Sequence, residues 1–310
     1  MSNLKEYLVI DNGGTFIKYA RMQENGSILK EGQVPTPPMS ATEEDYFKVL
    51  DELVADYGQN ISGLAFSSPG NIDSENGFCY TAGALVYFNG KPFADLVEER
   101  YHLPVSVEND GKCAALAEYW KGSLSDVKNG ATIVIGTGIG GGIIINGQLL
   151  RGEHFAAGEF SFKVANVDKM KEHAGYYSTN ASVGSLCHQL SQNMGIEPGK
   201  MNGKRVVELV EQGHGTAVAL WKKYIQNIAA LIYDLQSVLD LKRFAIGGGI
   251  SRNPRLLQEV EVALDRLFAK HPFKKYGIAV HKPEVVCCEF YNEANLVGAL
   301  YHHLKRFGEI

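Results

Sequence analysis

The chain has 310 residues, enough for two domains of ordinary size that each bury a hydrophobic core. Its 45% hydrophobic and 21% charged residues are typical of a soluble globular protein, and its net charge of -5 argues against binding to nucleic acid. The start Met1–Glu6 is polar and no apolar run approaches the ~20 residues of a membrane span, so we expect neither a signal peptide nor a membrane partner.

The first half predicts a strand-rich unit in which helices follow the strands. Thr42 is expected to cap the first helix, because acidic residues follow it directly. Apolar runs and glycine or proline breaks place the other elements. The predicted strands are Tyr7–Ile10, Phe16–Met22, Ile28–Val34, Ile61–Ser67 and Val105–Glu108, and the predicted helices are Glu43–Tyr57, Phe93–Tyr101 and Gly111–Lys121.

The second half repeats this opening. Helical periodicity follows from Ser182 to Leu239, interrupted at Pro198–Asn202 and at Gly213–Gly215. A further helix is expected after Pro254, and a last one at Asn292–Arg306 that packs back on the first half. The strands predicted here are Ala131–Ile135, Gly141–Ile145, Gln148–Arg151 and Phe244–Ile246. Two copies of one α/β unit would enclose a cleft in which ligands bind.

Three glycine clusters come directly after predicted strands: Asp11–Thr15, Gly136–Gly142 and Gly247–Gly249. Glycine lets the backbone turn with positive φ and lets N–H groups approach a ligand closely. Any one of them could be a tight hairpin, but three suggest one ligand held at several points, as a nucleoside triphosphate would be. The pattern is not a P-loop, and an Asn-Gly hairpin after the second cluster argues against a dinucleotide fold.

The five cysteines, Cys79, Cys113, Cys187, Cys287 and Cys288, are an odd number without metal-ligand spacing. Cysteines of this kind are typical of a reducing compartment, so we expect a cytoplasmic protein.

In series, the chain's motifs resemble those of the ROK family of repressors and sugar kinases. The resemblance implies the two-domain α/β, actin-like and ribonuclease-H-like ATPase fold, with residues 1–119 and 294–310 forming one domain and residues 120–293 the other. The matching segments are 11–18, Ser68-Pro69-Gly70, Glu108 to Glu118, Gly136 to Gly142, Ala157-Gly158-Glu159, Ile246 to Ile250 and Asn295 to Ala299.

Transfer of a phosphoryl group to a sugar hydroxyl needs a base and a rigid cradle. Asp110 lies at a strand-to-helix junction, where spacing alone would predict a helix N-cap. The resemblance implies instead that Asp110 is the catalytic base of the Glu-Asn-Asp motif. Asn109 beside it can donate to and accept from sugar hydroxyls. The resemblance further implies sugar contacts at Gly70, Asn71, Gly83 and Glu159.

For the nucleotide, the resemblance implies ATP with Mg²⁺. Asp11 would hold a hydrated Mg²⁺, and Lys18 would approach the phosphates. The remaining contacts are expected at the glycine turns, where one group cradles the β- and γ-phosphates and another leaves room for the adenosine. The first group is Gly13, Gly14, Thr15, Gly136, Thr137 and Gly138, and the second is Gly247, Gly248 and Gly249.

The chain departs from the family pattern after Glu159. Zinc-containing members continue to a Gly-His pair, whereas this chain has Ser161 and Phe162. No cysteine lies between Cys113 and Cys187, so we expect no zinc site, and His173 is interpreted as a surface residue. The chain thereby resembles the zinc-less branch of β-glucoside kinases, which phosphorylate the 6-hydroxyl of a non-reducing glucose. Glucokinase and N-acetylmannosamine kinase remain alternatives.

A different class of function is a sugar-binding repressor or sensor. Only about ten residues precede Asp11, too few for a helix-turn-helix domain, so we expect no DNA-binding role. A non-catalytic sugar sensor is disfavoured because Asp11, Lys18 and Asp110 are all present. The family favours homodimers, which makes a second copy of the chain a candidate partner besides the sugar.

Overall fold

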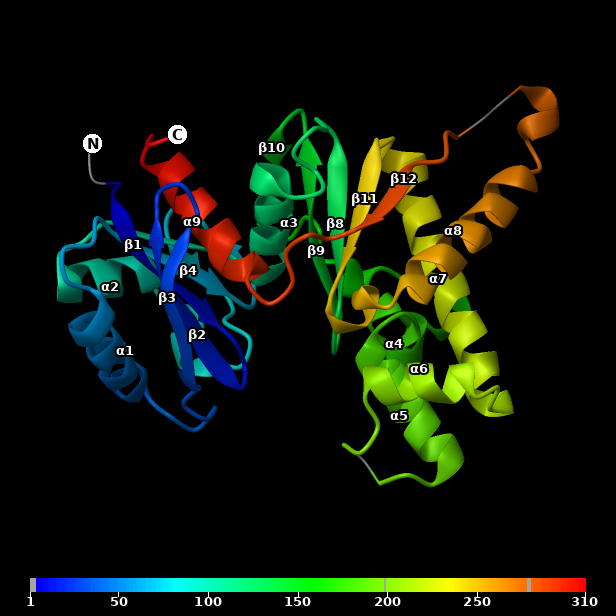
Figure 1. The fold of residues 1–310 in the computed structure, drawn as a ribbon, viewed down its shortest axis with the longest axis horizontal. Helices are drawn as coiled ribbons and strands as arrows, with labels where there is room; N and C mark the ends of the chain where they lie inside the picture. Colours follow the sequence, from blue (N-terminus) through cyan, green and yellow to red (C-terminus); the bar gives the residue numbers. More distant parts are fainter. Residues whose placement is uncertain (1–3, 198, 278–279) are drawn as a thin grey trace. The chain divides into compact units, whose positions relative to one another are not determined.

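Two five-stranded mixed sheets with the same strand order organise the chain (Figure 1). The structure is a computed structural model that describes residues 4–197, 199–277 and 280–310. In the first sheet the order is β3-β2-β1-β4-β7, and in the second it is β10-β9-β8-β11-β12. In each, an antiparallel hairpin opens the sheet and parallel strands extend it, as the repeated sequence pattern predicted. This is the actin-like ATPase fold.

The chain divides into two structural units, of which the first comprises residues 1–121, 149–157 and 292–310. Residues 149–157 therefore pack with the first unit, although they follow the hairpin of the second sheet. The elements of the first unit are β1 (Glu6–Asn12), β2 (Phe16–Gln23), β3 (Ile28–Pro35), α1 (Glu43–Tyr57), β4 (Leu64–Ser68), β5 (Ile72–Asp73), β6 (Phe78–Cys79), the 3₁₀ turn η1 (Val86–Phe88), α2 (Phe93–Tyr101), β7 (Val105–Asn109), α3 (Asp110–Lys121) and α9 (Ala294–Arg306).

The second unit comprises residues 122–148 and 158–291. Its elements, with β10 at the boundary, are β8 (Gly130–Ile135), β9 (Ile139–Ile145), β10 (Gln148–Leu149), the 3₁₀ turns η2 (Phe160–Phe162), η3 (Val167–Lys169) and η4 (His173–Gly175), then α4 (Tyr177–Asn180), α5 (Val183–Met194), α6 (Gly203–Glu211), α7 (Gly215–Leu239), β11 (Arg243–Gly247), η5 (Gly249–Arg252), α8 (Pro254–Ala269), η6 (Lys274–Tyr276) and β12 (Glu284–Cys287).

Most predicted elements are confirmed within a few residues. Strand β4 begins at Leu64 rather than at Ile61, because the chain turns before it joins β1 and β7. The predicted breaks around residues 199–202 and at Gly213 are present, whereas Pro198 lies outside the described residues. The short hairpin of β5 and β6 and the edge strand β12 were not predicted.

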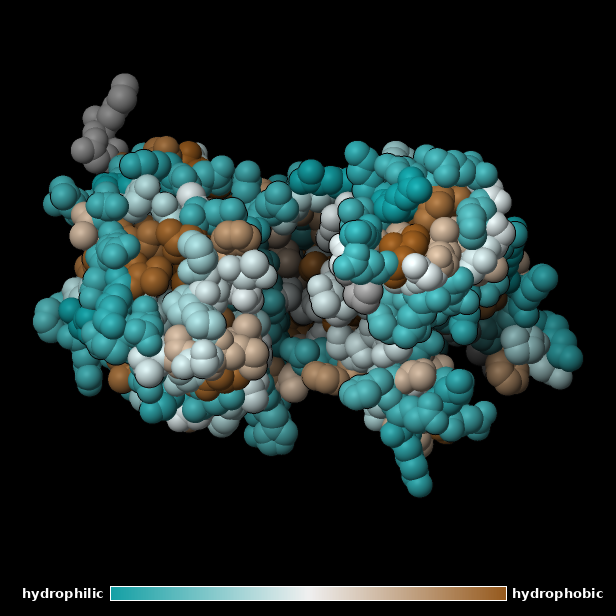
Figure 2. All heavy atoms as spheres, turned by 90° about the horizontal axis from the view of Figure 1, so that it is seen from below, coloured by the Kyte–Doolittle hydropathy of each residue, from teal (hydrophilic) through white to brown (hydrophobic). Residues whose placement is uncertain are grey.

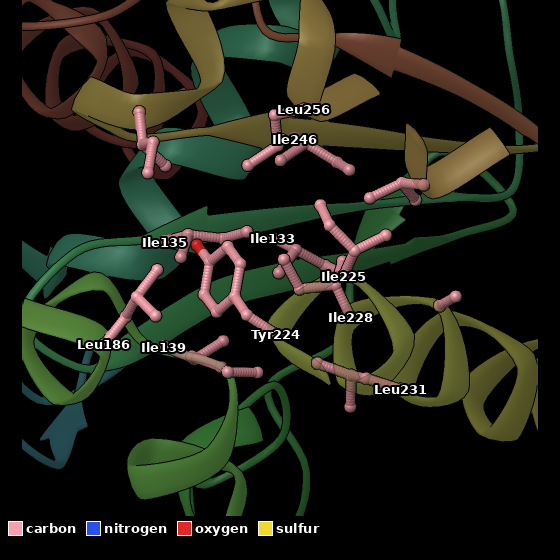
Figure 3. Packing of buried hydrophobic residues seen from close by; sticks show 14 of the residues in the cluster. Ile133, Ile135, Ile139, Leu186, Tyr224, Ile225, Ile228, Leu231, Ile246 and Leu256 are labelled. Carbon is pink, nitrogen blue, oxygen red and sulfur yellow. The ribbon is translucent and has the colours of Figure 1, made fainter. Parts of the chain in front are cut away.

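Each unit has its own hydrophobic core. In the second unit, isoleucines of β8 and β9 pack against the apolar face of α7 (Figure 3). In the first, α9 lies so close to α3 that a Cβ on Gly298 would be 1.8 Å from the Cys113 carbonyl oxygen. Only glycine permits this approach, and it confirms that the last helix packs on the first unit.

No helix among the described residues is long and apolar enough to cross a membrane. On the face drawn in Figure 2, hydrophobic side chains form separate groups among hydrophilic ones. The five cysteines all lie in the described part of the chain, and each is a free thiol there.

We expect acid to destabilise the first unit through two adjacent histidines of α9. Burial lowers the pKa of His302 and of His303 to about 4, and the neighbouring Arg306 acts in the same direction. As the pH falls, both histidines therefore bind protons in the unfolded chain before they do so in the folded one. The free energy of unfolding then decreases as pH drops from about 7 towards 4. Each histidine contributes roughly 3 kcal/mol to this loss.

Urea unfolding between pH 8 and pH 5 measures this effect. His303→Gln, which can still bond the Ser106 hydroxyl 2.9 Å from the imidazole, should flatten the pH dependence. His173→Gln, at an exposed position, is the control and should leave the slope unchanged. An unfolding free energy that stays constant from pH 7 to pH 5 contradicts the prediction.

Candidate active site

The turn after β1 is tight and depends on glycine. The Gly13 N–H donates to the Asp11 carbonyl oxygen at 3.0 Å, and a Cβ on Gly13 would lie 2.6 Å from the Phe16 carbonyl oxygen. The Thr36 hydroxyl donates to the Gly13 carbonyl oxygen at 2.6 Å and fixes the turn from outside. Gly14 and Thr15 follow at the tip, where they are exposed.

The Asp11 carboxylate is buried at the end of β1 and is held by hydrogen bonds from two other elements, β4 and α9. Its Oδ1 accepts from Ser67 at 2.8 Å and from Asn295 at 3.0 Å. Burial raises the pKa of Asp11, while these two hydrogen bonds and the charge of Lys18, its register partner on β2, oppose the rise. Ser67 was not predicted as a site residue; Asn295 stood in a matching segment but received no role.

The junction of β7 and α3 presents Asn109 and Asp110. The Asn109 amide nitrogen donates to the Gly70 carbonyl oxygen at 2.9 Å, and its oxygen accepts from the Lys112 N–H at 3.1 Å. Asp110 is the first residue of α3, and its carboxylate accepts from the Gly111 N–H at 2.8 Å. A carboxylate in the first turn of a helix interacts favourably with the helix dipole.

The loop that faces Asn109 is shaped by two glycines. Gly70 has φ +107, and a Cβ there would lie 2.2 Å from the Thr81 carbonyl oxygen; Gly83 has φ +57 and lies against Pro69. Asn71 donates its N–H to the Thr81 hydroxyl at 2.9 Å. Its buried Oδ1 finds no hydrogen-bond partner among the described residues. A buried acceptor left open in this way suits a ligand hydroxyl.

Two buried ionic groups, neither predicted as site residues, hold the 151–157 segment to this junction. Glu108 is fully buried and pairs with the Arg151 guanidinium at 2.9 Å. The Lys112 side chain is 1% exposed, and its ammonium donates to the Phe155 carbonyl oxygen at 2.9 Å. Only the fold brings Arg151 and Phe155 to this place, so spacing carried no signal for either contact.

A cavity of about 1060 Å³ opens in the second unit, beside the turn between β8 and β9. This volume is of the size that cofactors occupy. Among the predicted nucleotide residues, Gly136, Thr137 and Gly249 line it. The complete lining is Ile135, Gly136, Thr137, Val183, Gly184, Cys187, His188, Ser191, Gly199, Met201, Asn202, Gly203, Lys204, Val207, Glu208, Glu211, Gly249, Ile250, Arg252, Asn253 and Pro254.

The start of α5 forms one wall of this cavity. The N–H groups of Val183 and Gly184 both donate to the Gly136 carbonyl oxygen, at 3.0 and 3.2 Å. A Cβ on Gly184 would lie 2.8 Å from the Thr137 carbonyl oxygen, so this glycine allows α5 to approach the turn. Gly184 was missed by the sequence analysis, because a glycine inside a helical pattern carries no ligand signal by itself.

Gly138 and the pair Gly247–Gly248 are not in the cavity lining but shape it. Gly138 accepts from the Gly136 N–H at 2.9 Å and thereby closes the turn. Gly248 has φ +97, and a Cβ there would lie 2.1 Å from the Ile135 carbonyl oxygen. The glycine turns that end β8 and β11 therefore lie against each other at one side of the cavity.

Glu159 directly precedes the short turn η2 of the second unit, and Phe162 is the last residue of that turn. Glu159 is half-buried, whereas the Phe162 ring is 72% exposed and so is accessible to a ligand. His173 is exposed, as interpreted from the sequence. The structure thus gathers Asp11, Lys18, Gly70, Asn71, Gly83, Asn109 and Asp110 in the first unit, and places Glu159, Phe162 and the later glycine turns in the second.

The similarity of this chain to known proteins covers nearly its whole length. The model of the ROK family matches residues 7–305. A β-glucoside kinase of Klebsiella pneumoniae is 30% identical over 295 residues, which cover 94% of this chain and 94% of that protein.

Two crystal structures give the same picture. A ROK family protein of Streptococcus pneumoniae in complex with sucrose has a TM-score of 0.87 and 30% identity, and the alignment covers 98% of this chain and 100% of that one. A ROK family glucokinase of Streptomyces griseus in complex with glucose and AMPPNP has a TM-score of 0.76 and 27% identity, covering 95% of this chain and 98% of the other.

Proposed function

The chain belongs to the ROK family and is an ATP-dependent carbohydrate kinase of that family, and we propose that it phosphorylates the 6-hydroxyl of a glucose-type sugar, a β-glucoside in particular. The observation that carries the reaction is the placement of Asp110 in the first turn of α3, beside the fixed Asn109. The cavity at the second glycine turn supports a nucleotide site.

In this mechanism Asp110 is the general base. Its carboxylate accepts the proton of the 6-hydroxyl while that oxygen bonds to the γ-phosphorus and the bond from the γ-phosphorus to the β-phosphate bridging oxygen breaks. The hydrogen bond to the Gly70 carbonyl oxygen leaves Asn109 a second N–H with which to orient the sugar. The unpaired Asn71 Oδ1 would accept from another sugar hydroxyl.

The nucleotide half of the mechanism belongs to the second unit. Backbone N–H groups at Thr137 and Gly138 would bind the phosphates, and the lining around Gly249 and Ile250 would receive the adenosine. Gly13, Gly14, Thr15 and Lys18 would contribute from the first unit. Because the base and the cavity belong to different units, turnover requires both.

The surroundings of Asp11 suit a hydrated Mg²⁺ ion, which needs only one or two carboxylate ligands. They do not provide enough side chains for a metal bound by the protein alone. The Oδ1 oxygen of Asp11 accepts hydrogen bonds from Ser67 and Asn295, and these bonds fix the direction in which the Oδ2 oxygen points. Among the described residues no three His, Cys, Asp or Glu side chains group as metal ligands. Mg²⁺ is commonly held by one or two carboxylates together with substrate phosphates and water, and there it neutralises phosphate charge. Asp11 would hold and orient the water ligands.

Phe162 supports a β-glucoside as acceptor. A phenyl ring offers no hydrogen bond to a hydroxyl near C1 of the sugar, so free glucose gains no polar contact from Phe162. A β-linked second sugar has no free hydroxyl there and gains apolar contact with the exposed ring. The name of the Klebsiella relative supports this substrate class. The sucrose in the Streptococcus complex is a disaccharide but not a β-glucoside, so it supports only an acceptor that carries a second sugar ring.

We expect kcat/KM for cellobiose to equal or exceed that for glucose, and Phe162→His to shift the ratio modestly towards glucose. Steady-state rates with glucose, cellobiose, gentiobiose and N-acetylmannosamine measure this. Phe162→Leu is the control: it removes the ring without adding a hydrogen bond, so cellobiose should lose efficiency and glucose should gain none. A native preference for free glucose or N-acetylmannosamine above about tenfold removes the β-glucoside assignment and leaves the kinase.

The test of the function itself is ADP release against the same sugar panel, with thermal stabilisation measured in parallel. A kinase gives sugar-dependent ADP release and a sugar 6-phosphate product. A non-catalytic sensor would instead give stabilisation by sugar without turnover, and that result would overturn the proposal.

A further inference from the structure

The Ser161 hydroxyl forms hydrogen bonds with both backbone groups of one residue. It accepts from the Ile139 N–H at 2.9 Å and donates to the Ile139 carbonyl oxygen at 2.9 Å. Ile139 is the first residue of β9 and comes directly after the turn Gly136–Gly138. One side chain therefore provides hydrogen-bond partners for both the N–H and the carbonyl oxygen of Ile139, at the point where β9 leaves the turn.

The residues around Ser161 pack on the same strand. A Cβ on Gly158 would lie 3.0 Å from the Gly141 carbonyl oxygen, and a Cβ on Gly141 would lie 2.7 Å from the Phe160 ring. A Cβ on Gly138 would be 3.2 Å from the Ser161 hydroxyl oxygen. The 158–161 segment thus lies directly against β9, with the hydroxyl beside the turn itself.

This contact links two parts of the site that the proposed mechanism uses separately. Glu159 and Phe162, which we assign to the sugar, flank Ser161 in the chain. Thr137 and Gly138, which we assign to the phosphates, immediately precede Ile139. All of these residues belong to the second unit, so the link lies within one structural unit.

We propose that Ser161 is a positioning residue that couples sugar binding to nucleotide binding. A sugar held by Glu159 and Phe162 restricts the motion of the 159–162 segment. Through its two hydrogen bonds to Ile139, the Ser161 hydroxyl then restricts the motion of Ile139 and of the turn before it as well. The turn then presents its N–H groups to the phosphates with less conformational freedom to lose. Because coupling between two sites is reciprocal, bound nucleotide strengthens sugar binding by the same factor. The inference rests on the proposed function.

The experiment measures the dissociation constant of AMPPNP with Mg²⁺ by calorimetry, with and without saturating cellobiose, in the whole protein. In the native chain we expect cellobiose to tighten AMPPNP binding by about tenfold. In Ser161→Ala the factor should fall to about one, because Ile139 loses both bonds. Ser161→Thr keeps a hydroxyl and should restore most of the factor, which a merely space-filling role would not do.

Ser237→Ala is the matched control. The Ser237 hydroxyl also bonds a backbone carbonyl, that of Asp234 at 2.8 Å, but on the exposed side of α7. It should leave the coupling factor at the native value. If Ser161→Ala does not fold, Ser161→Cys supplies a weaker donor of similar size, and its factor should fall between those of the native chain and one.

The outcomes separate this inference from the proposed function. Absence of sugar phosphorylation by the native chain overturns the function. A native chain that phosphorylates the sugar but binds AMPPNP equally with and without it overturns the coupling. The same holds if Ser161→Ala, or Ser161→Cys in its place, retains the native factor within about twofold.

Discussion

Asp110→Asn is expected to lower kcat by about 10²–10⁴, the usual contribution of a positioned general base. The amide has nearly the shape of the carboxylate and can still accept from the Gly111 N–H, so the first turn of α3 should remain intact. It cannot take the proton of the sugar hydroxyl. Affinities for ATP and sugar should therefore stay within about tenfold, since they depend on groups that remain.

Asp45→Asn is the matched control for this variant. Asp45 also lies in the first turn of a helix, α1, and accepts from the Thr42 N–H at 3.1 Å. It is part of a capping box, so its replacement should lower stability slightly and leave kcat unchanged. Single-turnover measurements of sugar phosphate formation compare the two. Near-native turnover in Asp110→Asn would remove Asp110 from the mechanism.

Local pattern was sufficient to predict the repeated unit and the position of Asp110. The buried strand Tyr7–Ile10 is a continuous apolar run, and the turn after it requires Gly13, where a Cβ would lie 2.6 Å from the Phe16 carbonyl oxygen. The start of α3 at Asp110 follows from a strand that meets a helical pattern without a loop between them. These signals are contained in a few neighbouring residues, which is why the sequence alone carries them.

The contacts that support the site come from distant parts of the chain and leave no local signal. Lys112 is 1% exposed, and its ammonium donates to the carbonyl oxygen of Phe155, which lies more than forty residues along the chain. Arg151 would be read as the end of a strand, but it joins the first unit to pair with Glu108. Strand β12 is short and lies at a sheet edge, where four residues give too little periodicity to be recognised.

The second large effect is expected for Gly248→Ala, which should abolish measurable nucleotide binding. At φ +97 and ψ 165, Gly248 has a backbone conformation that is essentially restricted to glycine, with a strain of roughly 1–3 kcal/mol for other residues. The added Cβ would also lie 2.1 Å from the Ile135 carbonyl oxygen. The loop must therefore move away from the end of β8, and the cavity wall at Gly136 moves with it.

Gly249→Ala is the control, because it adds the same methyl group one residue further on. Apart from its neighbours in the chain, no atom of the described residues lies within 4 Å of a Cβ built on Gly249, although this residue lines the cavity. Its dissociation constant for AMPPNP should stay within about fivefold of the native value, and its Tm should be unchanged. Gly248→Ala should lower Tm by several degrees, since the strain and the clash both act on the folded state. Equal effects of the two substitutions would mean that added bulk in the cavity, rather than the glycine backbone at the end of β11, limits nucleotide binding.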